Sequence, residues 1–161
     1  DGCGGSVGCG VCAGSTPCQA DDNEKNDSRA MAKSLGTFTD SPLTQTSVKS
    51  LTMPDGDEDW FTFHVNDEGW GGNPKITVNA KLPSIDVSAY FLCDNQNDAS
   101  YCQQGTADNA IGHGCTGQGA VKLEASCNWT ITDSGTVVVR VRKHASDSQC
   151  TAYDLTVAVA E

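Results

Sequence analysis

The feature that most constrains this chain is a series of short segments in which apolar and polar residues alternate. Such alternation is typical of strands that bury one face, and Gly, Pro, Asn, Asp and Ser separate the segments. In residues 60–65, for example, Phe61, Phe63 and Val65 fall on one face. The expected strands, about eight in number, span residues 47–53, 60–65, 75–80, 85–92, 120–125, 129–132, 136–142 and 153–159. The sequence therefore predicts an all-β fold, an antiparallel β-sandwich or jelly roll.

Three stretches depart from this pattern. Residues 28–35 are compatible with a short helix, and the polar, glycine-rich segment 94–119 is expected to be a long inserted loop. Residues 1–20 contain six glycines and four cysteines and offer few side chains that can pack. Because 161 residues suit one ordinary domain, we expect a leader or linker at 1–20, rich in disulfides, and one sandwich domain at 21–161.

Cysteine content is high, with nine cysteines in 161 residues. Exposed thiols are a liability in a reducing cytosol, so this number favours disulfides and a secreted or cell-surface protein. The cysteines are Cys3, Cys9, Cys12, Cys18, Cys93, Cys102, Cys115, Cys127 and Cys150. Proximity along the chain suggests Cys93–Cys102 and Cys115–Cys127, and Cys150 could reach the leader, but sequence leaves the connectivity open. Because the number is odd, one cysteine is free, modified or bonded to another chain.

The net charge is −11 at pH 7, from 21 acidic and 10 basic side chains. Such a field repels phosphate backbones and anionic lipids, so we expect no nucleic-acid partner. No segment approaches the roughly 18 apolar residues of a membrane span, and we expect no membrane insertion. The same field attracts cations, and a hard cation needs an excess of carboxylates.

Acidic residues gather in two short stretches, 22–27 and 55–59. Carboxylates in such loops can converge on calcium, whereas like charges crowded into two turns are otherwise unfavourable. The second stretch is not an EF-hand, because Trp60 stands where the turn glycine belongs and Asn66 where the bidentate Glu belongs. The alternative interpretation is that both stretches are solvated turns.

Four motifs, taken in order, resemble a known family. Glu24-Lys-Asn-Asp-Ser28 is similar to the E-P-N-D-S opening of bacterial pre-peptidase C-terminal (PPC) domains. Gly56-Asp-Glu-Asp-Trp-Phe-Thr-Phe63 is similar to the family's G-D-x-D-W/Y-[YF]-x-F strand. Ser134-Gly-Thr-Val-Val-Val-Arg-Val141 and Tyr153-Asp-Leu-Thr-Val157 resemble its last strands. The resemblance extends over residues 22–159.

This resemblance implies a jelly-roll-like sandwich attached to secreted proteins and related to the collagen-binding domains of clostridial collagenases. In that branch an acidic N-terminal segment and the loop before the aromatic strand jointly bind calcium through an E-x-E-x-N-D pattern, whose first Glu is Asp here. The calcium ligands that the resemblance implies are Asp22, Glu24, Asn26, Asp27, Asp57 and Asp59. The departures from the family are Lys25 in place of proline, the four-cysteine leader and the segment 94–119.

We expect no enzymatic activity. Gly4-Gly-Ser-Val-Gly8 satisfies G-x-S-x-G, but its flanks supply neither the strand nor the helix which that motif needs. His64 alternates with Phe63 and Val65 and is expected to face away from the core, and His113 and His144 are expected in turns, with no nucleophile pattern nearby. Cys9-Gly-Val-Cys12 lacks the helix of a redox motif, and disulfides are favoured over a zinc site of the four leader cysteines.

Exposed aromatic residues can supply a contact surface, and Trp70 and Tyr101 are the candidate ligand contacts. The alternative for Trp70 is a hydrophobic cap on its glycine-rich loop. We expect a non-catalytic, calcium-stabilised adhesion or targeting module of a secreted or cell-surface bacterial protein. Its partner would be an extracellular protein or polysaccharide, or copies of itself. The rival is a structural subunit of an extracellular filament or surface assembly, linked through disulfides or strand addition.

Overall fold

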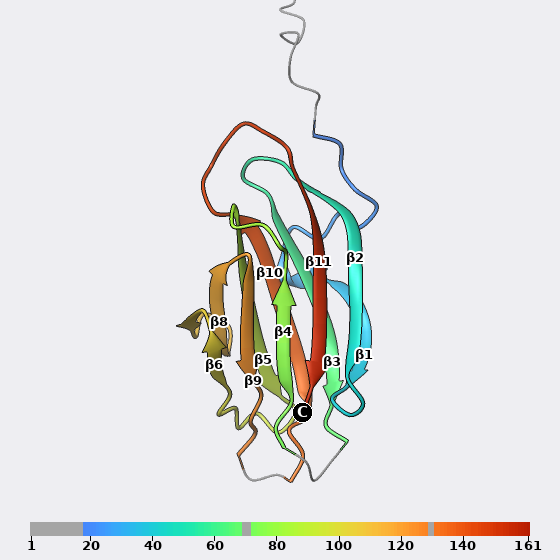
Figure 1. Cartoon of the computed structure of the whole chain (residues 1–161), viewed down its shortest axis with the longest axis vertical. Helices are drawn as coiled ribbons and strands as arrows, with labels where there is room; N and C mark the ends of the chain where they lie inside the picture. The colour runs from blue at the N-terminus through green and yellow to red at the C-terminus, as the bar shows by residue number, and fades with distance from the viewer. Residues whose placement is uncertain (1–17, 69–71, 129–130) are drawn as a thin grey trace, which may run out of the picture.

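The computed structural model describes residues 18–68, 72–128 and 131–161, which form two β-sheets packed face to face (Figure 1). The elements are the 3-10 helix η1 (Arg29–Met31) and the strands β1 (Lys33–Thr39), β2 (Thr44–Met53), β3 (Glu58–Asn66), β4 (Lys75–Asn79), β5 (Ile85–Cys93), β6 (Tyr101–Gln104), β7 (Thr106–Asp108), β8 (His113–Gln118), β9 (Ala120–Glu124), β10 (Gly135–Lys143) and β11 (Thr151–Ala160). The first sheet has the order β1-β3-β10-β5-β8-β7 and the second β2-β11-β4-β9-β6. No helix of the described residues is long and apolar enough to cross a membrane.

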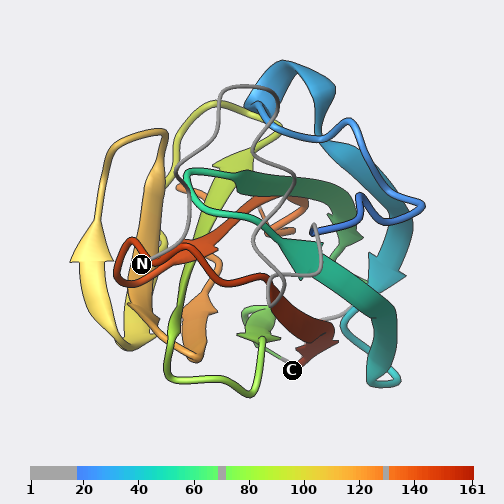
Figure 2. The ribbon, with the colours of Figure 1, turned by 90° about the horizontal axis from the view of Figure 1, so that it is seen from above.

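Eight of the strands form a jelly roll. The antiparallel pairs are β2 with β11, β3 with β10, β4 with β9 and β5 with β8. This is the nested pairing of an antiparallel chain folded over into two sheets. β1 extends the first sheet parallel to β3, while β7 and β6 extend the opposite edges beside β8 and β9. The predicted jelly-roll-like antiparallel sandwich is confirmed, and Figure 2 shows it end-on.

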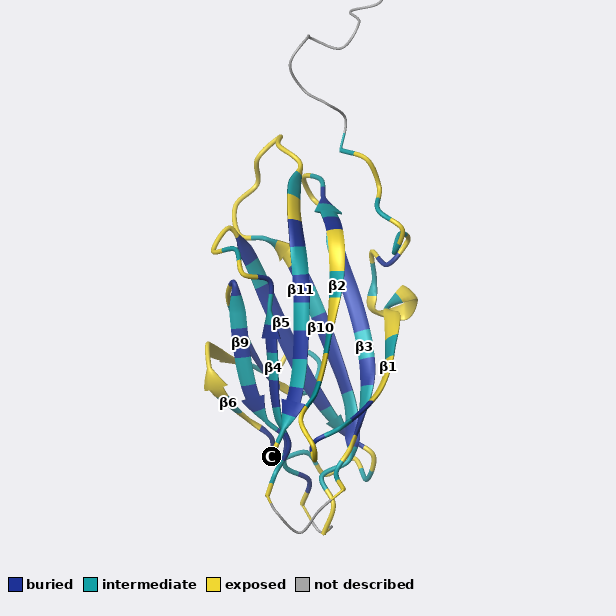
Figure 3. Ribbon diagram, turned by 45° about the vertical axis from the view of Figure 1, so that its right-hand side comes forward, coloured by how far each residue is buried: buried dark blue, intermediate teal, exposed yellow. Residues whose placement is uncertain are grey.

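Alternation along the strands builds the core between the two sheets (Figure 3). Phe61, Phe63 and Val65 of β3 face inward and are at most 1% exposed, as their spacing predicts. Phe38 of β1 packs on Phe63 with ring centroids 4.8 Å apart. Burying a side chain of this kind stabilises the fold by about 1.5–3 kcal/mol. The added edge strands β1 and β6 are mostly exposed in the same view.

The strand predictions hold for seven of the eight segments, which coincide with or overlap β2, β3, β4, β5, β9, β10 and β11. The exception is 129–132, where residues 131 and 132 are not in a strand and the first two lie outside the described residues. The helix expected at 28–35 is wrong beyond the single turn η1, because β1 begins at Lys33. The long loop expected at 94–119 is also wrong, since it contains β6, β7 and β8.

The six described cysteines form three disulfides, Cys18–Cys150, Cys93–Cys127 and Cys102–Cys115. The suggested pairs Cys93–Cys102 and Cys115–Cys127 are wrong, because the true partners meet in space rather than along the chain. Cys102 in β6 of the second sheet, for instance, bonds Cys115 in β8 of the first. The bond from Cys150 to the leader is confirmed. Disulfides of this number indicate an oxidising compartment outside the cytoplasm.

Part of the predicted leader and one predicted contact lie outside the described residues. They are Cys3, Cys9, Cys12 and Trp70, together with the G-x-S-x-G and CxxC motifs of residues 4–12. From residue 18 onward the N-terminal segment is fastened to the end of the sandwich where β2 leads into β3 (Figure 1). Thr52 holds it twice, because its amide donates to Asp21 Oδ2 at 2.9 Å and its hydroxyl donates to the Gln19 carbonyl at 2.7 Å.

Candidate metal centre

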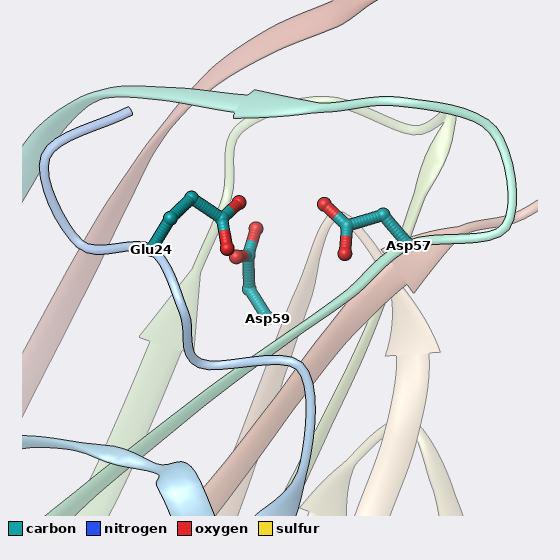
Figure 4. A group of neighbouring side chains, drawn as sticks. All are labelled: Glu24, Asp57 and Asp59. Atoms are coloured by element: carbon teal, nitrogen blue, oxygen red, sulfur yellow. The ribbon is translucent and has the colours of Figure 1, made fainter. Parts of the chain in front are cut away.

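Three carboxylates from two separate segments converge at this end of the sandwich. Each of Glu24, Asp57 and Asp59 offers one oxygen that lies within 4.8 Å of the other two. Figure 4 shows their side chains pointing toward one another, Glu24 from the N-terminal segment and the aspartates from the approach to β3 and its start. Glu24 and Asp57 are half-buried, whereas Asp59 is only 1% exposed.

The turn between β2 and β3 and the pleat of β3 place the two aspartates. Gly56 adopts a φ of 79°, a left-handed conformation that glycine reaches without strain. Asp57 follows it and accepts a hydrogen bond from the Glu58 amide at 2.9 Å through Oδ1. Asp59 stands two residues before the inward-facing Phe61, so its side chain points to the core side of the sheet. A carboxylate therefore occupies an inward-facing position of β3, whereas the next two inward-facing positions hold phenylalanine.

Asn26 brings Glu24 to the aspartates by pairing with Trp60 of β3. The Trp60 amide donates to the Asn26 carbonyl at 2.9 Å, and the Asn26 side-chain amide donates to the Trp60 carbonyl at 3.4 Å. This two-point attachment holds the segment before η1 against β3 at Trp60, the residue before Phe61, where the pairing of β1 with β3 begins. The disulfide Cys18–Cys150 anchors the same segment farther back along the chain.

Three buried oxygens around the cluster have no hydrogen-bond donor within the described structure: Asn26 Oδ1, Asp57 Oδ2 and Asp59 Oδ1. Asn26 and Asp59 are each 1% exposed, so bulk water does not serve these atoms. Leaving one such acceptor unsatisfied costs about 1–3 kcal/mol. A cation bound at the converging carboxylates would satisfy these three oxygens, which lie beside them.

The carboxylates raise one another's proton affinity. Burial is the largest cause that raises the pKa of Glu24 from 4.5 to about 7, and a hydrogen bond with the Asp27 side chain adds to it. Burial likewise raises the pKa of Asp59 from 3.8 to about 6, against the opposing hydrogen bond from Tyr153. The pKa of Asp57 is also raised, chiefly by burial. Without a cation, the cluster therefore holds protons that isolated carboxyl groups would release.

Tyr153 fixes the orientation of Asp59. This tyrosine of β11 is 4% exposed, and its hydroxyl donates to Asp59 Oδ2 at 2.5 Å from the opposite sheet. Its own pKa is raised by burial and by the charge of Asp59. One carboxylate oxygen is thus held by the protein while Oδ1 stays available. Sequence reasoning used Tyr153 only as part of a strand motif and missed this role. The available signal was a tyrosine, with its polar hydroxyl, at an inward-facing position of the last strand.

The six predicted ligands are not equally placed. Glu24, Asp57 and Asp59 converge, Asn26 is buried beside them, and exposed Asp27 bonds Glu24. Asp22 is exposed, and its neighbour Asp21 instead raises the pKa of both Asp57 and Asp59 by its charge. Asp21 is therefore the acidic residue that sequence reasoning overlooked at this position.

The other candidate residues lie away from the metal centre. Tyr101, the predicted contact, is 50% exposed on the short edge strand β6. Each histidine lies beside an aspartate: His64 is 3.7 Å from Asp94, His113 is 3.8 Å from Asp98, and His144 is 2.9 Å from Asp86. His144 also contacts the Gln118 amide at 2.7 Å. Within the described part of the chain, no serine or cysteine side chain hydrogen-bonds a histidine ring.

The fold and the site define a disulfide-bonded jelly-roll domain with a candidate hard-cation centre. No protein-family model matches the chain, and no curated protein matches it in sequence. Among solved structures, it is similar to a PliG-Ec mutant, a periplasmic inhibitor of g-type lysozyme from Escherichia coli, at 14% identity and a TM-score of 0.40. That match covers 80% of this chain and 98% of the inhibitor. A likeness at this level carries no argument about fold or function.

Proposed function

We propose that this chain is a non-catalytic, calcium-stabilised adhesion or targeting module of an exported protein. The observation that carries the calcium part is the convergence of Glu24, Asp57 and Asp59 from two segments, with a buried, donor-free Asp59 oxygen at its centre. An acidic cluster alone is weak support, because exposed carboxylates often gather without an ion. A carboxylate that is 1% exposed and lacks a cationic partner is costly, which makes this cluster different.

The donor set favours calcium over other metals. All candidate ligands are oxygens, and calcium takes about six to eight of them in a tolerant geometry, whereas zinc prefers nitrogen and sulfur. Asn26 and Asp27 stand next to the three carboxylates and would complete the protein's share of ligands, with water filling the rest. The motif resemblance to PPC domains supports the same assignment.

Calcium would act here by joining the N-terminal segment to the sandwich. Glu24 belongs to that segment, and the aspartates belong to the β2–β3 turn and β3, so one ion would bridge parts that are otherwise held by Asn26 and the Cys18–Cys150 bond. A ligand that binds only the folded state at 100 times its Kd stabilises that state by about 2.7 kcal/mol. For a domain of this size we expect a rise in Tm of about 5–10 °C.

Calorimetric melting with and without calcium tests the proposal. The wild type should gain stability from calcium, while Asp59→Asn should lose that gain and be no less stable than the wild type without metal, because it removes a buried like charge. Asp55→Asn is the matched control, since Asp55 lies in the same turn but bonds Ser146 outside the cluster. An identical calcium response in Asp59→Asn and the wild type would refute the assignment.

The rival function, a filament or surface subunit, draws support from the cysteine count. The six described cysteines bond one another, which leaves an odd number among Cys3, Cys9 and Cys12. Strand addition has less support, because the sheet edges are blunted. β1 has a register irregularity after Ser34, Ser50 of β2 has a φ of 58°, and β6 and β7 are 4 and 3 residues long. Non-reducing electrophoresis separates the two functions, since a ladder of disulfide-linked chains favours the rival.

A further inference from the structure

A short ridge stands beside a groove on the outward face of the first sheet. The ridge is the single turn η1, whose residues Arg29, Ala30 and Met31 are all exposed. Met31 is 48% exposed, although it is a large apolar side chain. Figure 3 shows this turn standing out from the sandwich next to β1. The ridge therefore offers a partner one apolar and one cationic side chain.

The ridge is held at both ends. Before it, Asn26 is attached to Trp60 at two points, and at its start the Met31 amide donates to the Ser28 carbonyl at 2.9 Å. After it, β1 pairs with β3 from Lys33 onward. A contact element that is fixed before binding loses little conformational entropy when a partner docks on it.

The groove has a volume of about 530 Å³ and lies over β3, β10 and β5. Four residues form its floor: Thr62, Thr136, Val138 and Leu92. They face outward because they alternate with core residues of the same three strands. The ridge packs on β3 and forms one wall, whereas Asp94 and Gln96, which follow β5, form the opposite wall. The groove therefore combines apolar and hydroxyl groups on its floor with one anion on the wall across from the ridge.

Two opposite charges, Arg29 and Asp94, stand on the opposite walls of the groove. None of the ion pairs among the described residues includes Arg29. The side chain of Asp94 is 57% exposed, and His64 lies 3.7 Å from it, beyond hydrogen-bonding distance. Both charges are therefore open to a group from another molecule.

Ridge and groove complement each other in chemistry, but within one copy they lie side by side and cannot meet. A second copy turned about a two-fold axis would place each ridge in the other copy's groove, so that the same contact forms twice. Met31 would then lie on the other copy's floor, at Leu92 and Val138, and Arg29 would face its Asp94. A second copy covers both elements at once, whereas a foreign ligand in the groove would leave the ridge uncovered.

Electrostatics limits where two copies can touch. Each has a net charge of −11, so they repel one another over most of their surfaces. A stable contact therefore needs a face on which the local charges balance. Arg29 and Asp94 give this groove one cation and one anion, and two-fold pairing turns them into two contacts of opposite charge. Such pairs favour this arrangement of the two copies over others.

We propose that two copies of this chain form a two-fold dimer, with η1 of each copy in the groove of the other and Arg29 of each facing Asp94 of the other. This inference goes beyond the proposed adhesion function, because it assigns a surface for self-association. It is independent of the calcium centre, which uses Asp57, Asp59 and the segment before η1.

Sedimentation velocity of the full chain at concentrations up to about 1 mM tests the dimer, because even a millimolar Kd populates dimers there. Arg29→Asp and Asp94→Arg should each weaken association at least about tenfold, since each places like charges at both contacts. An equimolar mixture of the two variants should associate again, because the mixed pair has opposite charges at both contacts. Lys122→Asp in β9 and Glu161→Arg after β11 are the matched controls, which change the net charge equally but lie away from the first sheet.

Recovery on mixing would identify the two-fold contact and would show that both variants are folded. Chains linked through the leader cysteines would instead stay associated in both variants. A chain that stays monomeric at about 1 mM, a dimer that both variants or the controls affect equally, or a mixture that fails to associate would overturn the proposal. The rise in Tm with calcium is measured on the same samples. A monomer that keeps this rise overturns only the dimer, and a dimer that lacks it overturns only the calcium proposal.

Discussion

Stability of the metal-free protein should fall as pH rises from 5 to 7.5, opposite to the behaviour of a domain whose carboxylates are paired. The folded pKa values of Asp59 and Glu24 are raised to about 6 and about 7 from 3.8 and 4.5. At a pH between the ordinary and the raised pKa values, the folded state holds protons that the unfolded state has released. The resulting stabilisation is fully present at low pH and is lost as pH rises through the folded pKa.

The magnitude comes mainly from Asp59. Moving its pKa from 3.8 to about 6 corresponds to about 3 kcal/mol as an upper limit over the whole shift, since each pH unit is worth about 1.4 kcal/mol. The part of this that is lost above pH 5 is therefore about 1.4 kcal/mol. Glu24 is only half-buried, so solvent screens its share and we assign it no separate figure. Because the carboxylates interact, the loss should spread over the whole interval between pH 3.8 and about 7 rather than form two steps.

Urea unfolding after calcium removal on a chelating resin measures this effect, because soluble chelators themselves change affinity with pH. Asp59→Asn should abolish most of the pH dependence, whereas Asp55→Asn should keep it and so account for the general effect of net charge. Added calcium should reverse the slope, since the ion displaces the protons. A wild-type stability that stays constant or rises from pH 5 to 7.5 without metal would refute the electrostatic reasoning.

Two further substitutions test the supports of the site. Replacing Cys18 and Cys150 with serine opens a loop of 132 residues, and the chain-entropy relation gives a loss of about 5 kcal/mol in the free energy of unfolding. Urea unfolding should show this loss, and calcium binding should also weaken. An unchanged urea midpoint would contradict the anchoring role of the disulfide. Tyr153→Phe removes the donor to Asp59, so we expect a loss of about 2 kcal/mol and weaker calcium binding by titration calorimetry. Calcium affinity equal to that of the wild type would show that Tyr153 does not orient Asp59.

The strands that pack through large side chains could be predicted from the sequence. The strands in which close packing requires glycine could not. β10 carries a run of β-branched residues and was identified from its pattern. β8 was not, because Gly114 must lack a side chain: a Cβ there would meet the Ala89 carbonyl oxygen at 2.2 Å and the Tyr90 ring at 2.8 Å. A glycine that tertiary packing requires looks like loop composition in the sequence. β1 was hidden for a related reason, since Gly36 with a φ of 92° interrupts its alternation.

The disulfides show the same limit of local reasoning. Chain proximity suggested that Cys93 would bond Cys102, but Cys102 bonds Cys115 of β8, and the jelly roll returns the chain to Cys93 only after β9. The partner of Cys93 could be found only once the pairing of β5 with β10 was known, because Cys127 belongs to the loop that leads into β10. The bond of Cys150 to the leader was one possibility that sequence left open, and chain proximity gave no support for it, since the two cysteines are 132 residues apart.

Composition alone cannot distinguish a metal centre from a pair of solvated acidic turns. Asp57 and Asp59 fit equally well as solvated turn residues or as ligands, since both interpretations need acidic residues before an aromatic strand. The pleat of β3 separates the two interpretations. Two residues before Phe61, Asp59 must face inward, where it is 1% exposed and Tyr153 donates to its Oδ2. A turn aspartate loses nothing by standing alone in water, whereas burial raises the pKa of this one to about 6, so its anion is costly without a cation nearby. The alternation that identified the core therefore also identifies the residue on which the calcium proposal stands or falls.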